Sequence, residues 1–190
     1  EIASIASVCR DAGWLLHMDG ARYANACAHL DCELAALSSQ AGVDVLSLGA
    51  TKNGAMYAEA VLIFSDRIDV EAVHFLRKQH TQLASKMRFA AAQFQAMFGG
   101  DLWHRNASEA NRLARRLADG VRTVPGIEVM YPVQANGVFA RLPEHMLEPA
   151  RKLQYFYDWE GEGHVVRWMT SFDSSEAQID GFVEGLRDIV

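Results

Sequence analysis

Two short, continuous apolar runs near the N-terminus constrain the fold of this chain more than any other sequence feature. The first is WLLHM at residues 14–18, which ends in Asp19 and Gly20, and the second is VDVLSLG at residues 43–49. Runs of this kind are typical of parallel strands that are buried on both faces of a sheet. A third run, AVLIF at residues 60–64, completes an alternation of strand and helix patterns. The sequence therefore predicts an α/β sheet.

Past residue 66 the pattern changes to long helices and then back to strands. A helical pattern covers about residues 70–98 and stops at Gly99 and Gly100. Strand patterns follow in IEVMY, in GVFARL, and in FYDW and HVVRWM, which are joined through EGEG. A final helix is expected, because Ser175 and Gln178 have the spacing of a capping box.

These patterns indicate two units. Residues 1–85 are predicted to form part of a larger α/β domain with a mostly parallel sheet and flanking helices. Residues 86–190 are predicted to form long connecting helices and a smaller α+β domain. Because the chain starts at Glu1 directly in a helical pattern, we expect it to be a piece of a longer protein.

The composition excludes several classes of partner. Of the 190 residues, 50% are hydrophobic and 22% are charged, which is ordinary for a globular protein with a real core. The formal net charge of −6 and the lack of a basic run argue against nucleic acid and against anionic membrane surfaces. No apolar stretch approaches the ~18 residues of a membrane span. The cysteines Cys9, Cys27 and Cys32 lack metal-site spacing, so we expect buried, inert thiols and a reducing cytoplasm.

Asp19 and Lys52 each follow an apolar run, so both are expected at the carboxyl edge of the sheet, where ligands of α/β sheets bind. A lysine and a carboxylate there suggest pyridoxal 5'-phosphate, because the amine can form a Schiff base and the carboxylate can keep the pyridine nitrogen protonated. Two simpler interpretations remain open: Asp19 as a helix N-cap and Lys52 as a solvated loop lysine. His17, inside the first run, is interpreted as a core histidine, with a place beside a cofactor as the alternative.

Two arginines are further candidates. Arg22 lies one helical turn after Asp19, so it could share the site of Asp19 or form a surface ion pair with it. Arg167 interrupts the apolar segment VVRWM and needs an anionic partner. That partner could be Asp158 or Glu160 on the facing strand, or the carboxylate of a substrate. Residue pattern alone leaves both possibilities open.

The segments LHMDGARYANA and SLGATKNGAMYAEAV resemble the low-specificity L-threonine aldolase family. This family consists of pyridoxal-phosphate-dependent lyases of the aspartate-aminotransferase fold group. The resemblance continues through SKMRFAAAQ, DLWHRNASEAN, FYDW and VVRWMTSF. It covers essentially the whole chain and corresponds to the C-terminal part of a family member.

The resemblance implies a role for each candidate residue. Lys52 is expected to form the internal aldimine with the cofactor, and Asp19 to contact the pyridine nitrogen. Arg22 is expected to contact the phenolic oxygen of the cofactor or the substrate, and Arg167 to bind the substrate carboxylate. Thr51 is expected near the phosphate. The loop that binds much of the phosphate and the histidine that stacks on the ring are expected in an N-terminal part outside this chain.

The activity implied by the resemblance is aldol cleavage of L-threonine or L-allo-threonine to glycine and acetaldehyde. The partner would be a small amino-acid substrate, and we expect a cytoplasmic homodimer or homotetramer for the full-length protein. Two alternatives remain: another pyridoxal-phosphate lyase or aminotransferase that acts on an amino acid, and a non-catalytic fragment that only packs and oligomerises.

Overall fold

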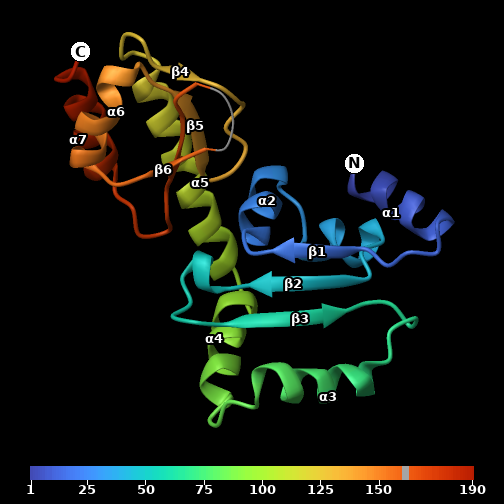
Figure 1. The fold of residues 1–190 in the computed structure, drawn as a ribbon. Helices are drawn as coiled ribbons and strands as arrows, with labels where there is room; N and C mark the ends of the chain where they lie inside the picture. The colour runs from blue at the N-terminus through green and yellow to red at the C-terminus, as the bar shows by residue number, and fades with distance from the viewer. Residues whose placement is uncertain (160–162) are drawn as a thin grey trace. The chain divides into compact units, whose positions relative to one another are not determined.

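The computed structural model describes residues 1–159 and 163–190, and these form two compact units, Glu1–His104 and Arg105–Val190. The boundary predicted near residue 85 falls between two helices of the first unit. The first unit contains the following elements (Figure 1): α1 (Ile2–Asp11), β1 (His17–Gly20), α2 (Tyr23–Leu30), η1 (Leu34–Leu37), η2 (Ser39–Ala41), β2 (Val45–Gly49), η3 (Thr51–Asn53), β3 (Glu59–Ile63), α3 (Val70–Thr81) and α4 (Arg88–Phe98). Helix α5 (Leu102–Val121) begins in this unit and continues into the second.

The sheet of the first unit has the order β1-β2-β3. Strands β1 and β2 are parallel, as expected, and Asp19 lies opposite Ser47. Strand β3 is antiparallel to β2, which its apolar run did not indicate. The connection over residues 50–58 contains only the turn η3, and it is too short for the crossover that a parallel neighbour requires.

The expectation that the strands are buried on both faces is wrong. Burial alternates along β2, and β1 is buried at Gly20 while His17 and Asp19 are exposed. Trp14, at the start of the first apolar run, lies before β1 and is 63% exposed. The interpretation of His17 as a core histidine is therefore wrong as well. Strand β2 thus has one packed face and one open face, whereas no residue of β3 is buried.

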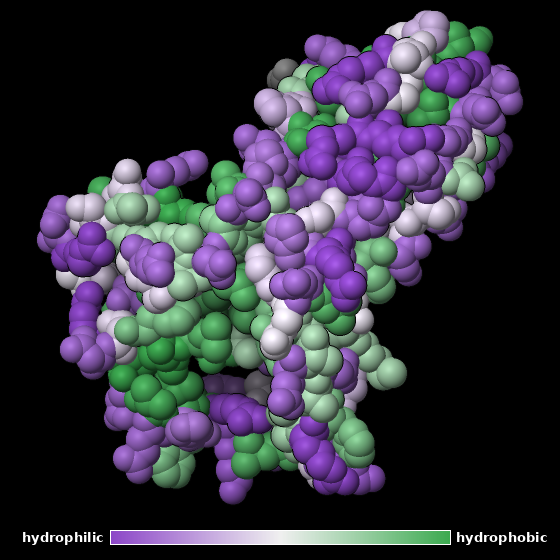
Figure 2. Space-filling model, turned by 180° about the vertical axis from the view of Figure 1, so that it is seen from behind, coloured by the Kyte–Doolittle hydropathy of each residue, from purple (hydrophilic) through white to green (hydrophobic). Residues whose placement is uncertain are grey.

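Helix α2 supplies the core on the packed face. Tyr23 and Cys27 of α2 pack with Leu46 and Leu48 of β2. The Tyr23 hydroxyl donates a hydrogen bond to the Leu34 carbonyl of η1, which ties the helix to the following segment. Hydrophobic residues also gather on the face of the first unit that Figure 2 shows. The exposed large apolar side chains of the sheet region are Trp14, Leu15, Val61, Leu62 and Phe64.

The second unit packs α5 and two further helices on an antiparallel sheet of order β4-β5-β7-β6. Its remaining elements are β4 (Glu128–Val129), β5 (Gly137–Arg141), α6 (Glu144–Leu153), β6 (Tyr157–Asp158), β7 (Val165–Met169) and α7 (Glu176–Arg187). The strands fall within the predicted segments, and the capping box of Ser175 and Gln178 is confirmed. The sequence patterns did not anticipate α6, which contains Pro149.

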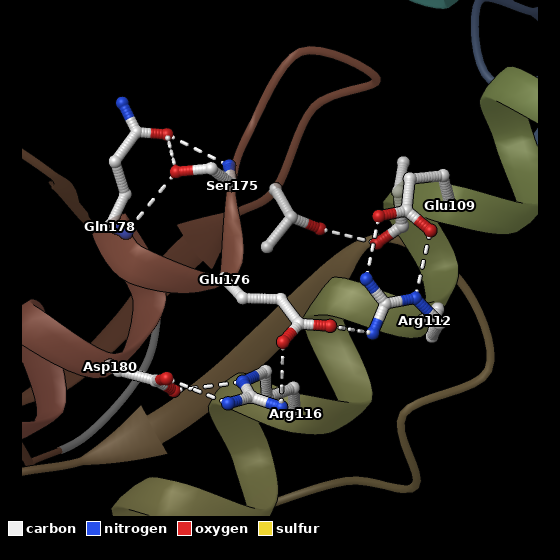
Figure 3. A network of polar contacts seen from close by, with 9 residues as sticks. Glu109, Arg112, Arg116, Ser175, Glu176, Gln178 and Asp180 are labelled. Carbon is white, nitrogen blue, oxygen red and sulfur yellow. Dashed lines mark hydrogen bonds and ion pairs between the residues drawn. The ribbon is translucent and has the colours of Figure 1, made fainter.

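An exposed ion-pair network joins α5 to α7 within the second unit (Figure 3). Arg112 binds Glu109 and Glu176, each at 2.6 Å. Arg116 binds Asp180 at 2.6 Å and Glu176 at 3.2 Å. Because all these side chains are 40–49% exposed, each pair contributes little by itself. The apolar packing beneath them, which includes Leu113, Leu117, Val138, Val166 and Trp168, carries most of the stability.

All three cysteines are free thiols, but only Cys27 is buried, whereas Cys9 and Cys32 are partly exposed. The expectation of buried thiols is therefore confirmed for Cys27 alone. No helix in the described part of the chain has both the length and the apolar character that crossing a bilayer requires.

Burial makes the first unit sensitive to alkali. Burial raises the pKa of the Cys27 thiol from 9.0 to about 12 and that of the Tyr23 hydroxyl from 10.0 to about 12. Both groups are neutral in the folded unit but ionise earlier in the unfolded chain. The free energy of unfolding is therefore highest below pH 9.0 and falls as the pH rises toward about 12. The fall is up to about 1.4 kcal/mol per pH unit for each group.

Urea unfolding at several pH values between about 8 and about 11 measures this slope. Cys27→Ala removes one of the two ionising groups, so its free energy of unfolding should fall less steeply with pH than that of the wild-type protein. Equal slopes in the two proteins would contradict the assignment to Cys27.

Candidate functional site

Lys52 lies in the turn η3, directly after β2, and its side chain is exposed. The Ala50 carbonyl accepts hydrogen bonds from the Asn53 N–H at 3.0 Å and from the Ala55 N–H at 3.1 Å. Gly54 ends the turn with a φ of 119°, a conformation that side-chain-bearing residues rarely adopt. The turn therefore fixes the backbone from which the lysine extends.

Three polar side chains hold the loop around Lys52. The Thr51 hydroxyl donates to Glu59 Oε1 at 2.9 Å and accepts from the Ala58 N–H at 3.2 Å. Asn53 Nδ2 donates to the Trp103 carbonyl at 3.0 Å. Gln93 Oε1, on α4, accepts from the Met56 N–H at 2.8 Å. The lysine is thus exposed on a loop whose two ends are anchored, and Thr51 uses its hydroxyl within that loop.

Asp19 lies on the open face of β1, and its side chain is exposed. Its Oδ1 accepts a hydrogen bond from the Ala21 N–H at 2.9 Å. The N-cap position of α2 is Arg22, so the interpretation of Asp19 as the N-cap of this helix is wrong. The same face carries His17 and Ser47, whose Nε2 and Oγ lie 2.8 Å apart. The carboxylate therefore belongs to a polar strip on the uncovered side of the sheet.

The parallel register of β1 and β2 brings Asp19 and Lys52 to one edge of the sheet. Gly20 pairs with Leu48, β2 ends at Gly49, and the turn that carries Lys52 follows. A Cβ on Gly49 would lie 2.8 Å from Glu59 Oε2 and 3.1 Å from the Ala21 Cα, so the strand end packs closely against the segment that follows β1. Both predicted residues thus lie where ligands of α/β sheets bind.

Arg22 follows Asp19 on the connection from β1 to α2. It occupies the N-cap position of the helix and is partly buried. The connection thus carries a cation and an anion within one short segment at the same sheet edge.

Arg167 lies on β7 in the second unit, and its neighbours there are aromatic. Phe139 on β5 and Tyr157 on β6 lie opposite Arg167 in the register. The Trp159 ring centroid lies 5.2 Å from the guanidinium carbon, in cation–π contact. The guanidinium is therefore held against rings and is partly exposed.

The sequence offers two carboxylates, Asp158 and Glu160, as protein partners of Arg167. Asp158 instead forms its ion pair with Arg151, and Glu160 lies outside the described residues. Among the described carboxylates, none lies within ion-pairing distance of Arg167. The Arg167 guanidinium thus retains N–H donors for an anionic ligand.

A metal site has no support in the described residues, which contain no group of three or more His, Cys, Asp or Glu side chains suited to hold an ion. Sequence reasoning missed the polar residues around Lys52, above all Asn53 and Gln93. The only signal that could have found them is the pair of small residues Gly49 and Gly54 flanking the TKN segment, which marks a constrained turn.

Comparison with known proteins identifies relatives along the whole chain. Residues 1–144 match the family described as beta-eliminating lyase. A low specificity L-threonine aldolase of Pseudomonas aeruginosa is 45% identical over 188 residues, which are 98% of this chain and 54% of that protein. A low specificity L-threonine aldolase of a Pseudomonas species is 41% identical over 191 residues, which cover 100% of this chain and 55% of that protein. The chain thus spans about half the length of the curated relatives it matches.

Solved structures give the same picture of the fold. The structure of Leishmania major threonine aldolase superposes with a TM-score of 0.88 at 28% identity and covers 100% of this chain and 56% of its own. The structure of Oryza sativa TDC with PLP and tryptamine gives a TM-score of 0.77 at 16% identity and covers 99% of this chain and 44% of its own. The second likeness concerns the fold alone.

The backbone of the Lys52 turn predicts the effect of a substitution at Gly54. Gly54→Ala places a Cβ at a φ of 119° and should destabilise the first unit by about 1–2 kcal/mol. Gly181→Ala is the control, because Gly181 lies in α7 with no other atom within 4 Å of its added Cβ. Alanine there should be neutral or stabilising by up to about 1 kcal/mol. Equilibrium urea unfolding of both variants checks the difference, and equal effects would contradict the role of the turn.

Proposed function

This chain belongs to the beta-eliminating lyase family, and from that premise we propose that the full-length protein cleaves L-threonine or L-allo-threonine to glycine and acetaldehyde with pyridoxal 5'-phosphate. The observation that carries the proposal is the placement of Asp19 and Lys52 at the same carboxyl edge of two parallel strands. The names of the Pseudomonas relatives, at 45% and 41% identity, support this reaction over another lyase or an aminotransferase.

The residues at this edge fit the proposed cofactor. An exposed lysine on an anchored loop offers an amine that can bond to an aldehyde. An exposed carboxylate, Asp19, lies on the same open edge, and the Ala21 N–H fixes its Oδ1. When bound, pyridoxal phosphate supplies an electron sink for the pair released from the substrate Cα–Cβ bond.

Each residue then has a definite task in the proposed reaction. Lys52 would hold the cofactor covalently through Nζ. Asp19 keeps a proton on the ring nitrogen, because a carboxylate favours the charged form of a neighbouring base. Arg22 would contact the phenolic oxygen of the cofactor or the substrate. Thr51 would contact the phosphate, and this contact would replace its hydrogen bond to Glu59.

Arg167 is proposed to bind the substrate carboxylate through its planar guanidinium, which can donate two parallel hydrogen bonds. The contact with Trp159 supports this role, because a ring face restricts the orientations of the guanidinium without using its N–H donors. A substrate oriented by its carboxylate can present the Cα–Cβ bond for cleavage. The proton of the β-hydroxyl must pass to a base in the same step.

We also propose a cytoplasmic homodimer or homotetramer for the full-length protein. The three free thiols are typical of a reducing compartment. The exposed apolar side chains of the sheet region are of the kind that protein interfaces cover.

The identity of the cofactor lysine is the first test. Full-length protein saturated with pyridoxal phosphate and reduced with borohydride should carry the cofactor on the peptide that contains Lys52. Lys52→Ala should lose this label and all release of acetaldehyde and glycine from threonine. Lys152→Ala, on α6 of the second unit, is the matched control and should retain both. A label on another lysine would refute the proposed site, and a keto acid as product would refute the reaction.

A second test separates a substrate-binding role of Arg167 from a structural one. Arg167→Lys replaces a planar fork with a point charge, so kcat/KM should fall by roughly ten- to a thousandfold and KM should rise. The melting temperature should stay near the wild-type value. Arg141→Lys, at the Arg141–Glu128 ion pair of 3.1 Å, should keep normal kinetics. A large fall in melting temperature with near-normal kinetics would instead identify Arg167 as a structural residue.

A further inference from the structure

The residue next to Lys52 in sequence has the opposite environment. Asn53 is only 4% exposed, although Lys52 before it is exposed. Its Nδ2 donates to the Trp103 carbonyl at 3.0 Å and lies 3.6 Å from the Met97 sulfur. These partners belong to α5 and α4 and lie 50 and 44 residues further along the chain. A buried side-chain amide therefore fastens the lysine turn to two helices of the first unit.

We infer that Asn53 is a positioning residue that sets the reactivity of Lys52 toward the cofactor aldehyde. The inference rests on the proposed function, since it takes Lys52 as the residue that bonds to the cofactor. A lysine amine is separated from its backbone by four flexible methylene groups, so its reach depends on where the backbone is held. Attack on a carbonyl requires the reacting atoms to meet at about 3–3.5 Å with the correct alignment.

The other contacts of the loop do not replace this one. Thr51 forms hydrogen bonds with Glu59 and Ala58, which belong to the same hairpin as the turn. These two hydrogen bonds therefore move with the turn and do not attach it to a helix. Gln93 holds Met56, on the far side of Gly54. Among the side-chain hydrogen bonds described above, the one from Asn53 connects the turn η3 itself to helices α4 and α5.

The chemistry of the contact selects asparagine. Its amide donates to a carbonyl oxygen, which a carboxylate of the same shape cannot do. Leucine has a similar size but no donor, and it would leave the Trp103 carbonyl without this partner. Asn53→Leu should therefore keep the loop packed while releasing the turn from its anchor.

The test measures capture of the cofactor by the protein before any turnover. Cofactor-free full-length protein is mixed with pyridoxal phosphate, quenched with borohydride at timed intervals, and digested, and the labelled Lys52 peptide is quantified. The amount of unlabelled Lys152 peptide recovered in each digest serves as the internal reference for protein quantity. In Asn53→Leu, capture at Lys52 should slow by about ten- to a hundredfold relative to the wild-type protein, with the recovery of the Lys152 peptide unchanged.

The control separates positioning from a general loss of stability. Asn136, in the second unit, is also a buried asparagine at 6% exposure, and its Nδ2 donates to the Thr170 carbonyl at 2.7 Å. Asn136→Leu should lower the melting temperature by a similar amount but capture the cofactor at the wild-type rate. If Asn53→Leu does not fold, Asn53→Ser replaces it, because the serine hydroxyl is too short to reach the same carbonyl.

The outcomes are distinct. Capture at the wild-type rate in the folded Asn53 variant would overturn the inference, as would equal slowing in Asn136→Leu. Either result leaves the proposed function intact, provided that the wild-type protein is labelled at Lys52. A wild-type label at a different lysine would overturn both the inference and the proposed site.

Discussion

The parallel pairing of β1 with β2 is the constraint on which the rest of the site depends. It begins at Asp44, whose Oδ2 accepts from the Leu16 N–H at 2.7 Å, and this hydrogen bond holds the pKa of the carboxyl below its usual range. The Leu16 carbonyl accepts from the Asp44 and Val45 N–H groups in return. From this anchor the register runs to Gly20 opposite Leu48, so both strands reach the same edge. A shift of one residue would move Asp19 to the packed face.

Because side chains alternate along a strand, that register gives the two faces of the sheet different roles. Leu46 and Leu48 point to the face that α2 covers, and burying them provides much of the hydrophobic stabilisation of the first unit. Asp19 and Ser47, one residue out of phase, lie on the open face. Charged and polar groups therefore reach the sheet edge without the cost of burying an unpaired charge. The same sheet both stabilises the unit and displays its functional groups.

Local signals predicted part of this arrangement. The strand segments, the turn at Lys52 and the capping box at Ser175 depend on neighbours within a few residues, and the sequence shows such neighbours directly. The direction of β3, the burial of only one strand face and the contacts of Asn53 depend on which distant segments meet. Asn53 finds its partner 50 residues away, and no local pattern specifies such a contact. The anionic partner of Arg167 is undetermined by pattern for the same reason, because Asp158 satisfies Arg151 instead.

The three-stranded sheet has a further consequence for how this chain behaves in solution. Strands β1 and β3 each pair on one side only among the described residues, so each presents a row of backbone N–H and C=O groups to its surroundings. Such an edge is a template for any extended segment that meets it. Templating is a bimolecular event, and its rate grows with concentration, whereas the unfolding rate of a single chain does not. Loss of the isolated chain through strand pairing between copies should therefore become faster as its concentration rises.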